Sequence, residues 1–194
     1  MYPETCAAPP ARAGIDELDT IQRVAQGDKR AFERLYRCYF RRLTRFLDQI
    51  TRTPQLTEEI LDDTMVVVWH KAASFTGASS LSTWIFAIAH NKAMKALKRE
   101  KRLSEVPYEL DEARDSSSPE RDFIDLQTRT GLQHFLAALS SEQRAVVELT
   151  YYHGHAYREI AEIVGCPVDT VKTRMFHARR KLKAMLLEHG RDAL

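Results

Sequence analysis

Apolar residues recur at intervals of three and four along almost the whole chain, which is the spacing of one face of an α-helix. No segment alternates apolar and polar residues in the way that a half-buried strand would. Only seven glycines and seven prolines interrupt the pattern in 194 residues. Because 44% of the residues are hydrophobic, such helices can bury real cores, and the sequence predicts an all-α fold.

The first half of the chain predicts a small four-helix domain over residues 15–102, preceded by a tail over residues 1–14. After a short first helix, the second begins at Asp28, whose side chain can cap it. The third follows Pro54, which suits a first helical turn. A loop then leads to the fourth helix, which starts near Ser82 and ends in a basic run.

Residues 103–128 change character and predict a flexible acidic linker. Between residues 104 and 122 there are seven acidic and two basic side chains around a run of three serines. Ser118 followed by Pro119 is a good helix start, and Ser140 with Gln143 forms the pattern of a capping box. We therefore expect a second small helical domain over residues 129–190.

The second domain contains the most informative pattern in the chain. A short helix burying Ile160 and Ala161 should stop at Gly165, turn, and pass to a second helix that buries Val171 and Met175. The small alanine and the glycine at the turn allow the two helices to cross closely. This order predicts a helix-turn-helix.

The unburied face of the second helix is basic and aromatic, which is typical of a helix that enters a major groove. Residues near its start can reach base edges, where Phe176 suits thymine methyl groups, and the arginines suit phosphates. The alternative is a solvated basic face on a helical hairpin, but the preceding glycine turn favours DNA. The predicted contacts are Thr170, Lys172, Thr173, Arg174, Phe176, His177, Arg179 and Arg180.

A second basic surface is expected on the fourth helix and on the loop before it. Aromatic rings beside cations suit single-stranded nucleic acid, because bases stack on rings while the backbone follows positive charge. Trp84 nevertheless fits a core position. The candidates on this surface are Phe75, Ser80, Thr83, Phe86, His90, Asn91, Lys92, Lys95, Lys98 and Arg99.

Composition narrows the remaining classes of function. The net charge is only +2, so the distribution of charge is more informative than its sum. Three widely spaced cysteines predict neither a disulfide scaffold nor a zinc site, and we expect no metal and no cofactor. No apolar run could span a membrane and no leader pattern is present, so we expect a cytoplasmic protein without membrane insertion.

The sequence gives little support to an enzymatic function. His153-x-His155 lacks an evident third metal ligand and is expected to lie in a surface turn. Asp62 and Asp63 are adjacent on a helix and point about 100° apart, so they make a poor acid–base pair. We therefore predict no enzymatic activity.

The motifs of both domains resemble those of bacterial RNA polymerase sigma factors of the extracytoplasmic function (ECF) group. The resemblance covers roughly residues 15–102 and 129–188. It rests on the order of several motifs: Gly27-Asp28-x-x-Ala31-Phe32, Asp62-Asp63-Thr64, Phe75-x-Gly77, Ser82-Thr83-Trp84-Ile85, Leu139-Ser140-x-x-Gln143-Arg144 and Glu159-Ile160-Ala161-x-x-x-Gly165-Cys166-Pro167.

The resemblance implies partners and roles. Asp62 and Asp63 would dock on the core RNA polymerase, and the surface from Phe75 to Arg99 would capture the melted minus-ten element of promoter DNA. The helix from Thr170 to Arg180 would read the minus-thirty-five element as duplex. Members of the family are often held inactive by an anti-sigma factor, so such a partner is expected.

Three departures from the family pattern limit what can be transferred. Ala156 stands where a Ser or Thr cap is common, His177 occupies a position that is often basic, and Asp62-Asp63 replaces a glutamine–acid pair. The rival interpretation is a free-standing helix-turn-helix regulator, which would bind a palindromic operator as a dimer.

Overall fold

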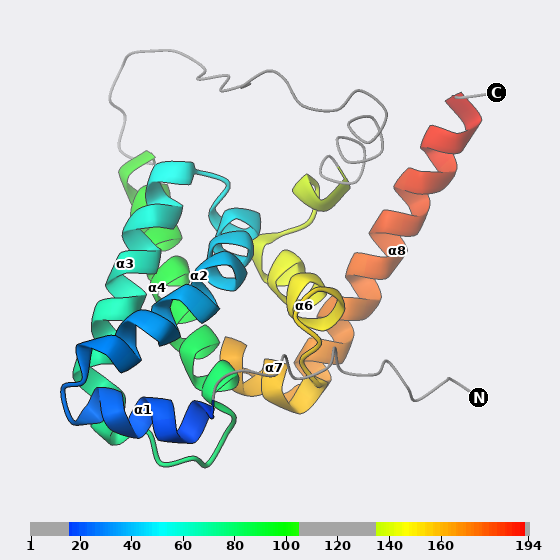
Figure 1. Ribbon diagram of the computed structural model, residues 1–194. Helices are drawn as coiled ribbons and strands as arrows, with labels where there is room; N and C mark the ends of the chain where they lie inside the picture. Colours follow the sequence, from blue (N-terminus) through cyan, green and yellow to red (C-terminus); the bar gives the residue numbers. More distant parts are fainter. Residues whose placement is uncertain (1–15, 105–134, 193–194) are drawn as a thin grey trace.

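The computed structural model of the protein describes residues 16–104 and 135–192. Every secondary-structure element in these two ranges is helical (Figure 1), which confirms the predicted all-α fold. The predicted tail over residues 1–14 lies outside the described residues. Nearly all of the predicted linker, including Ser118-Pro119, also lies outside them.

The first unit follows the predicted order of helices. Its elements are α1 (Glu17–Ala25), α2 (Lys29–Thr51), α3 (Pro54–Lys71), the short 3-10 helix η1 (Ala72–Ser74) and α4 (Leu81–Ser104). Asp28 caps α2 as predicted, because its carboxylate accepts the backbone N–H groups of Arg30 and Ala31 at 2.9 and 3.1 Å. Pro54 occupies the first turn of α3.

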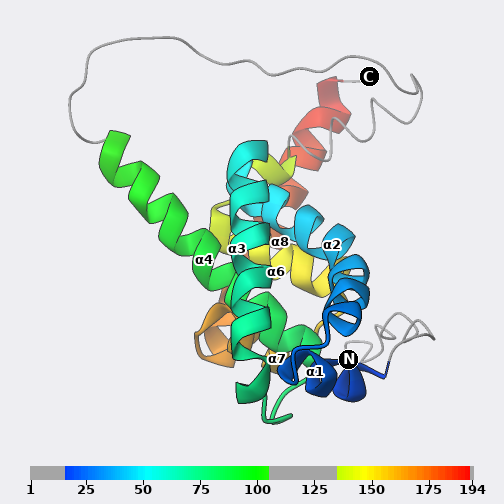
Figure 2. The ribbon, with the colours of Figure 1, turned by 60° about the vertical axis from the view of Figure 1, so that its left-hand side comes forward.

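The second unit consists of α6 (Ser141–Tyr151), α7 (Tyr157–Val164) and α8 (Val168–Asp192). The predicted capping box at the start of α6 is present: the Gln143 N–H donates to Ser140 Oγ, and the Ser140 N–H donates to Gln143 Oε1. Gly165 ends α7 with a φ of 66°, and α8 follows two residues later. In Figure 2 the C-terminal ends of α4 and α8 project from the body of the molecule.

One face of α2 provides most of the core of the first unit. Apolar side chains recur along it at helical spacing and are fully buried against α1, α3 and α4, as the sequence predicts. The hydroxyl of Tyr39 is satisfied in this core, since it donates to Glu17 Oε1 of α1 at 2.8 Å. These buried residues are Ala31, Leu35, Tyr39, Leu43, Phe46, Leu47 and Ile50.

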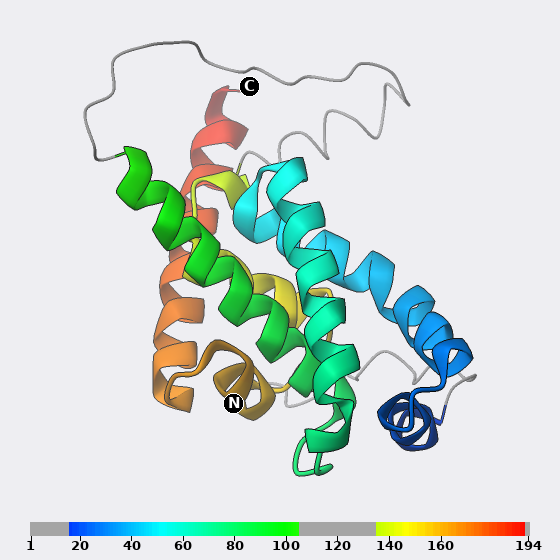
Figure 3. The same ribbon diagram turned by 90° about the vertical axis from the view of Figure 1, so that its left-hand side faces the viewer.

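The two units do not stand apart but pack into one body. Helix α4 lies against α7, and α2 lies against α6, so that α4 runs alongside the second unit (Figure 3). The buried apolar residues of both units form one continuous cluster rather than two. The junction between the units is therefore part of the core of the molecule.

Imidazole rings occupy the centre of this junction. His153 and His155 lie in the segment between α6 and α7, and both are buried, so the expected surface turn is wrong. The ring of Phe86 on α4 lies 4.7 Å from that of His153 and 5.3 Å from that of His155, between centroids. In the sequence, two histidines around a glycine suggest a surface turn. In the structure their neutral imidazoles are buried, because such rings pack well against aromatic rings.

Charged and polar groups surround these rings. Arg45 Nε of α2 donates to Glu148 Oε1 of α6 at 2.5 Å, and the Arg45 guanidinium lies 3.5 Å from the ring centroid of Tyr152. Arg144 Nη2 donates to the carbonyl oxygen of Ile50, which is 94 residues away in sequence. The junction is thus held by polar contacts as well as by apolar burial.

Burial keeps the histidines of the junction neutral. Desolvation lowers the pKa of His153 to about 3, and the nearby Arg42, His155 and Arg45 charges act in the same direction. Desolvation and Arg174 lower the pKa of His90 to about 4, against an opposite effect of Glu142. Desolvation also lowers the pKa of His155, although Glu159 opposes it. The folded form therefore requires uncharged imidazoles.

The left-handed backbone at Gly165 predicts that a substitution there destabilises the helix-turn-helix. A Cβ there would meet nothing within 4 Å, so only the left-handed backbone opposes it. We expect Gly165→Ala to lower the free energy of unfolding by about 1 kcal/mol. Gly165→Asn should cost less, because asparagine tolerates this conformation. Urea unfolding followed by circular dichroism measures both, and equal losses would contradict the backbone explanation.

The buried histidines predict that acid destabilises the fold. Their pKa values are lowered in the folded form, so the stabilisation is complete above about pH 6.5 and is lost as the pH falls below that value. Below that pH, His90 and His153 should each lower the free energy of unfolding by about 1.4 kcal/mol per pH unit. Burial raises the pKa of Glu148, which offsets part of this loss.

Urea midpoints at pH 7 and at about pH 5 measure this dependence. His153→Phe keeps a ring against Phe86 but has no titrating nitrogen, so it should flatten the dependence on pH. The matched control is His70→Gln on the exposed surface of α3, which should leave the dependence unchanged. Equal midpoints at both pH values for the unsubstituted chain would contradict the prediction.

Candidate nucleic-acid interface

The start of α8 presents side chains to solvent beyond the glycine turn. Lys172, Thr173, Phe176 and His177 are all exposed, and 61% of Phe176 is accessible. They project from the opposite side of α8 to Val171, Met175 and Ala178, which are buried. The helix-turn-helix therefore holds an exposed basic and aromatic face on a rigid helix.

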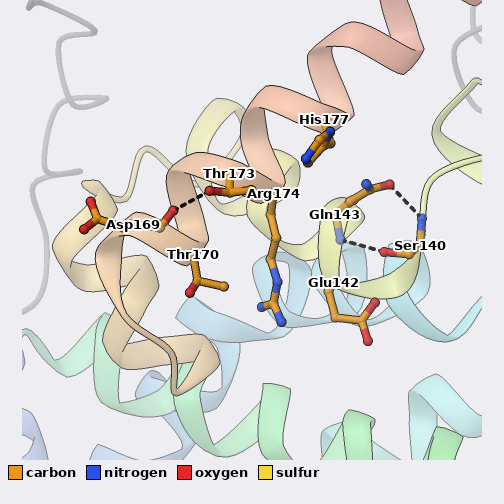
Figure 4. A pocket seen from close by; sticks show the side chains of 8 residues that line it. All are labelled: Ser140, Glu142, Gln143, Asp169, Thr170, Thr173, Arg174 and His177. Atoms are coloured by element: carbon orange, nitrogen blue, oxygen red, sulfur yellow. Dashed lines mark hydrogen bonds between the residues drawn. The ribbon is translucent and has the colours of Figure 1, made fainter.

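Thr170 and Arg174 lie deeper than the sequence suggests, because both are half-buried. They line an open cavity of about 470 Å³ between the start of α8 and the start of α6, where Arg174 extends beside Glu142 (Figure 4). Burial alone would raise the pKa of Glu142, but hydrogen bonds from the backbone and Ser140, together with Arg174, lower it. Glu142 therefore stays ionised and attracts Arg174.

Several cations of α8 already have partners within the second unit. Lys172 Nζ donates to Asp169 Oδ1 at 3.0 Å, and Thr173 Oγ1 donates to the Asp169 carbonyl oxygen at 2.9 Å. Arg179 Nε donates to the Tyr151 hydroxyl at 2.9 Å. These contacts orient the side chains without burying them, so they remain available to phosphates.

The basic surface of α4 is interleaved with acidic groups of α3. Lys92 Nζ lies 2.7 Å from Asp63 Oδ2, and Arg99 Nη2 lies 3.6 Å from Glu59 Oε1. Asn91, Lys95 and Lys98 are exposed next to them. The structure therefore brings Asp63 together with a predicted DNA-binding lysine, while Asp62 remains exposed on α3.

The loop before α4 is fixed by its own contacts. The ring of Phe75 is half-buried against that of Trp84, with centroids 5.4 Å apart. Ser80 Oγ and Thr83 Oγ1 lie 2.8 Å apart, and the Thr83 N–H donates to Ser80 Oγ, which starts α4. Phe75 and Ser80 are both partly accessible at the surface.

Three predicted contacts of the α4 surface lie inside the molecule. Thr83, Phe86 and His90 are buried, and Phe86 is fully enclosed. The reason is that α4 has two occupied faces: one covers the core of the first unit and the other packs against α7. In this arrangement none of the three can contact DNA, which corrects the expectation that they lie on the open surface.

Sequence reasoning also missed the residues that close the junction, above all Arg45, Glu148 and Glu159. The Glu159 carboxylate accepts the Ala156 N–H at 2.9 Å and the Thr83 hydroxyl at 3.2 Å, so it caps α7 and contacts α4. One signal was available: Glu148 interrupts the apolar run from Ala145 to Leu149, and a charge there needs a buried partner.

Two classes of site find no support in the part of the chain that the structure describes. Residues 16–104 and 135–192 bring together no group of three His, Cys, Asp or Glu side chains that could hold a metal ion. Among the same residues, no helix combines the length and apolarity needed to cross a membrane. Cys38 and Cys166 are both free thiols.

Two family models match the chain in the order of its two units. The model of Sigma-70 region 2 matches residues 35–103, and that of Sigma-70, region 4, matches residues 129–182. The chain is 30% identical over 158 residues to the ECF RNA polymerase sigma factor RpoE of Cereibacter sphaeroides, covering 80% of this chain and 86% of that protein. It is 28% identical to the RNA polymerase sigma-H factor of Pseudomonas aeruginosa, over 89% of this chain and 95% of that protein.

Two solved structures are similar to the whole arrangement of helices. The sigma factor RpoE in complex with the anti-sigma factor NepR, from Bartonella quintana, has a TM-score of 0.65 and 26% identity, over 80% of this chain and 96% of that one. CnrH in complex with the cytosolic domain of CnrY has a TM-score of 0.63 over 87% of this chain and 96% of that one, and at 24% identity it supports the fold. With both regions in order on the two helical units, the chain belongs to the ECF group of RNA polymerase sigma factors, DNA-binding proteins of transcription initiation.

Proposed function

We propose that the exposed face of α8 reads the minus-thirty-five element of promoter duplex DNA, as the centre of a DNA-binding unit over residues 129–190. The observation that carries the proposal is the exposure of Lys172, Thr173 and Phe176 on one side of a helix that the glycine turn anchors. Phe176 suits thymine methyl groups, and Lys172 suits an acceptor on a base edge. Arg179 and Arg180 lie further along, where they can hold phosphates.

The first unit, over residues 15–102, is proposed to bind the melted minus-ten element. Asn91, Lys95, Lys98 and Arg99 form an exposed polar and basic track on α4, and Phe75 at the preceding loop offers a ring for stacking. Binding an extruded base offsets the few kcal/mol that unstacking costs, so this surface would favour melting. Lys92 would join the track once it leaves Asp63.

Asp62 and Asp63 are proposed to dock the chain on the core RNA polymerase. Both carboxylates are exposed on α3, and Asp62 lies on the far side from the buried Ile60 and Thr64. The proposal extends to an anti-sigma partner, because the sigma factor RpoE of Bartonella quintana, to which the chain is similar, is in complex with the anti-sigma factor NepR. Such a role needs no catalysis and would place the chain with polymerase in the cytoplasm.

Promoter-dependent transcription tests the proposal. Purified core polymerase, given a template with the upstream region of this chain's own gene, should make a defined transcript only when the chain is added. Lys172→Ala should reduce that transcript about tenfold or more, since one lost base contact costs about 1–3 kcal/mol. Lys183→Ala is the matched control, because Lys183 is an exposed lysine about three turns later on the same helix.

The same preparation distinguishes the rival function. A dimeric helix-turn-helix regulator would bind duplex DNA tightly without core polymerase and would run as a dimer in solution. Light scattering with and without core measures the number of copies. A dimer that binds duplex alone and yields no transcript with core would contradict the sigma-factor assignment of α8.

A further inference from the structure

We propose that the solvent face of α2 is a third DNA-binding surface, which holds the phosphate backbone of duplex DNA without reading its sequence. The surface consists of five exposed arginines, which we call the arginine row: Arg30, Arg34, Arg37, Arg41 and Arg45. Neither of the two proposed promoter-reading surfaces includes any of them. The inference goes beyond the proposed function, because contacts to phosphates do not depend on which promoter element α8 reads.

The arginine row runs along α2 on the side opposite the core. Its members are three or four residues apart, so all five fall within an arc of about 80° on the helix surface. Leu35, Tyr39 and Leu43 of the same helix are fully buried on the other side. From Arg30 to Arg45 the row is about 22 Å long, at about 1.5 Å per residue. One strand of a duplex presents about six phosphates over that length.

Most of the arginine row is free to bind an anion. Arg30, Arg34 and Arg41 take part in no ion pair within residues 16–104 and 135–192. Arg37 Nη2 lies 2.6 Å from Glu33 Oε1, but 76% of the Arg37 side chain remains accessible. Such an exposed ion pair contributes little stability and is easily exchanged for another. A phosphate can therefore reach these four arginines without displacing a buried partner.

The arginine row opposes the stability of its own helix, which distinguishes it from an ordinary solvated face. Arg30 lies in the first turn of α2, where the helix dipole disfavours a positive charge, and that turn contains no acidic residue. Arg30 and Arg34 are like charges four residues apart, and so are Arg37 and Arg41, a spacing that destabilises a helix. A polyanionic partner accounts for this unfavourable arrangement.

The chemistry of the row suits the phosphates of a duplex. All five side chains are arginines, although the exposed basic track of α4 uses Lys95 and Lys98. A planar guanidinium donates two parallel hydrogen bonds to one phosphate, which the ammonium of lysine does not. Binding of a single strand would need rings for stacking. Phe40, the exposed ring of α2, lies outside the arc of the row and packs on Tyr36, with centroids 5.6 Å apart.

The row ends beside the arginines of α8 that are proposed to hold phosphates. The Arg45 guanidinium lies 3.5 Å from the ring centroid of Tyr152. The preceding residue, Tyr151, accepts a hydrogen bond from Arg179 Nε at 2.9 Å. Two adjacent tyrosines thus connect the row to α8. This connection favours DNA over an acidic protein as the partner, and for this step the proposal rests on the role proposed for α8.

The test removes two charges from the middle of the row. Arg34→Ala combined with Arg41→Ala should keep the fold, because both positions are exposed and alanine is the best helix former. The matched control is Lys71→Glu at the exposed end of α3, which changes the net charge by the same amount. A third variant, Arg34→Lys combined with Arg41→Lys, keeps both charges. Circular dichroism verifies that all variants keep their helices.

Anisotropy of a fluorescein-labelled, mixed-sequence duplex measures binding by the full chain at increasing salt concentration. The alanine variant should bind about tenfold more weakly than the unsubstituted chain near about 100 mM salt. The slope of log affinity against log salt should be shallower by about 2, because each lost phosphate contact removes about 0.9. Lys71→Glu should keep the slope, and the lysine variant should keep it with weaker binding. A promoter duplex should show the same loss, since phosphates carry no sequence information.

Three results would overturn the proposal. No duplex binding by the unsubstituted chain at low salt, or equal slopes for it and the alanine variant, would show that the row holds no phosphates. An equal loss in Lys71→Glu would show a general effect of net charge. Unchanged duplex binding together with row-dependent binding of poly-L-glutamate would assign the row to an acidic protein. None of these results depends on transcript synthesis, so failure of the proposed function is recognised separately.

Discussion

Helix α4 has two faces to bury, and the architecture follows from how both are satisfied. One face completes the core of α1 to α4, and the other meets α7, with Phe86 enclosed between Phe46 and the rings of His153 and His155. Because these imidazoles must stay neutral to be buried there, a single aromatic cluster couples the packing of both units to protonation. The two units of this sigma factor consequently share one core.

Local signals in the sequence were sufficient for the helices. Asp28, Ser140 with Gln143, and Gly165 act within four residues of themselves, so their caps and turn could be read directly and are confirmed. The same holds for the buried positions of α2, which recur at intervals of three and four residues. Periodicity and capping describe one helix at a time, and at that level the prediction needed no tertiary information.

The junction could not be predicted in this way. Arg45 and Glu148 are 103 residues apart, and no spacing rule links them. His153 and His155 beside a glycine suggest a surface turn, and only the arrival of Phe86 from α4 makes their burial favourable. For the candidate site, exposure was predictable for Lys172, Thr173 and Phe176 of α8, but not for Thr170 and Arg174, which are half-buried beside the start of α6. It was not predictable on α4, because a second unit covers part of the surface.

The central claim is that the aromatic cluster around Phe86 joins the two units into one core. Hydrogen exchange of residues 150–160, measured for the unsubstituted chain and for Phe86→Ala, tests this directly. Slow exchange in the unsubstituted chain and faster exchange in Phe86→Ala are the predicted result, since His153 and His155 would lose the ring that covers them. Fast exchange in the unsubstituted chain, or equal protection in both chains, would contradict it.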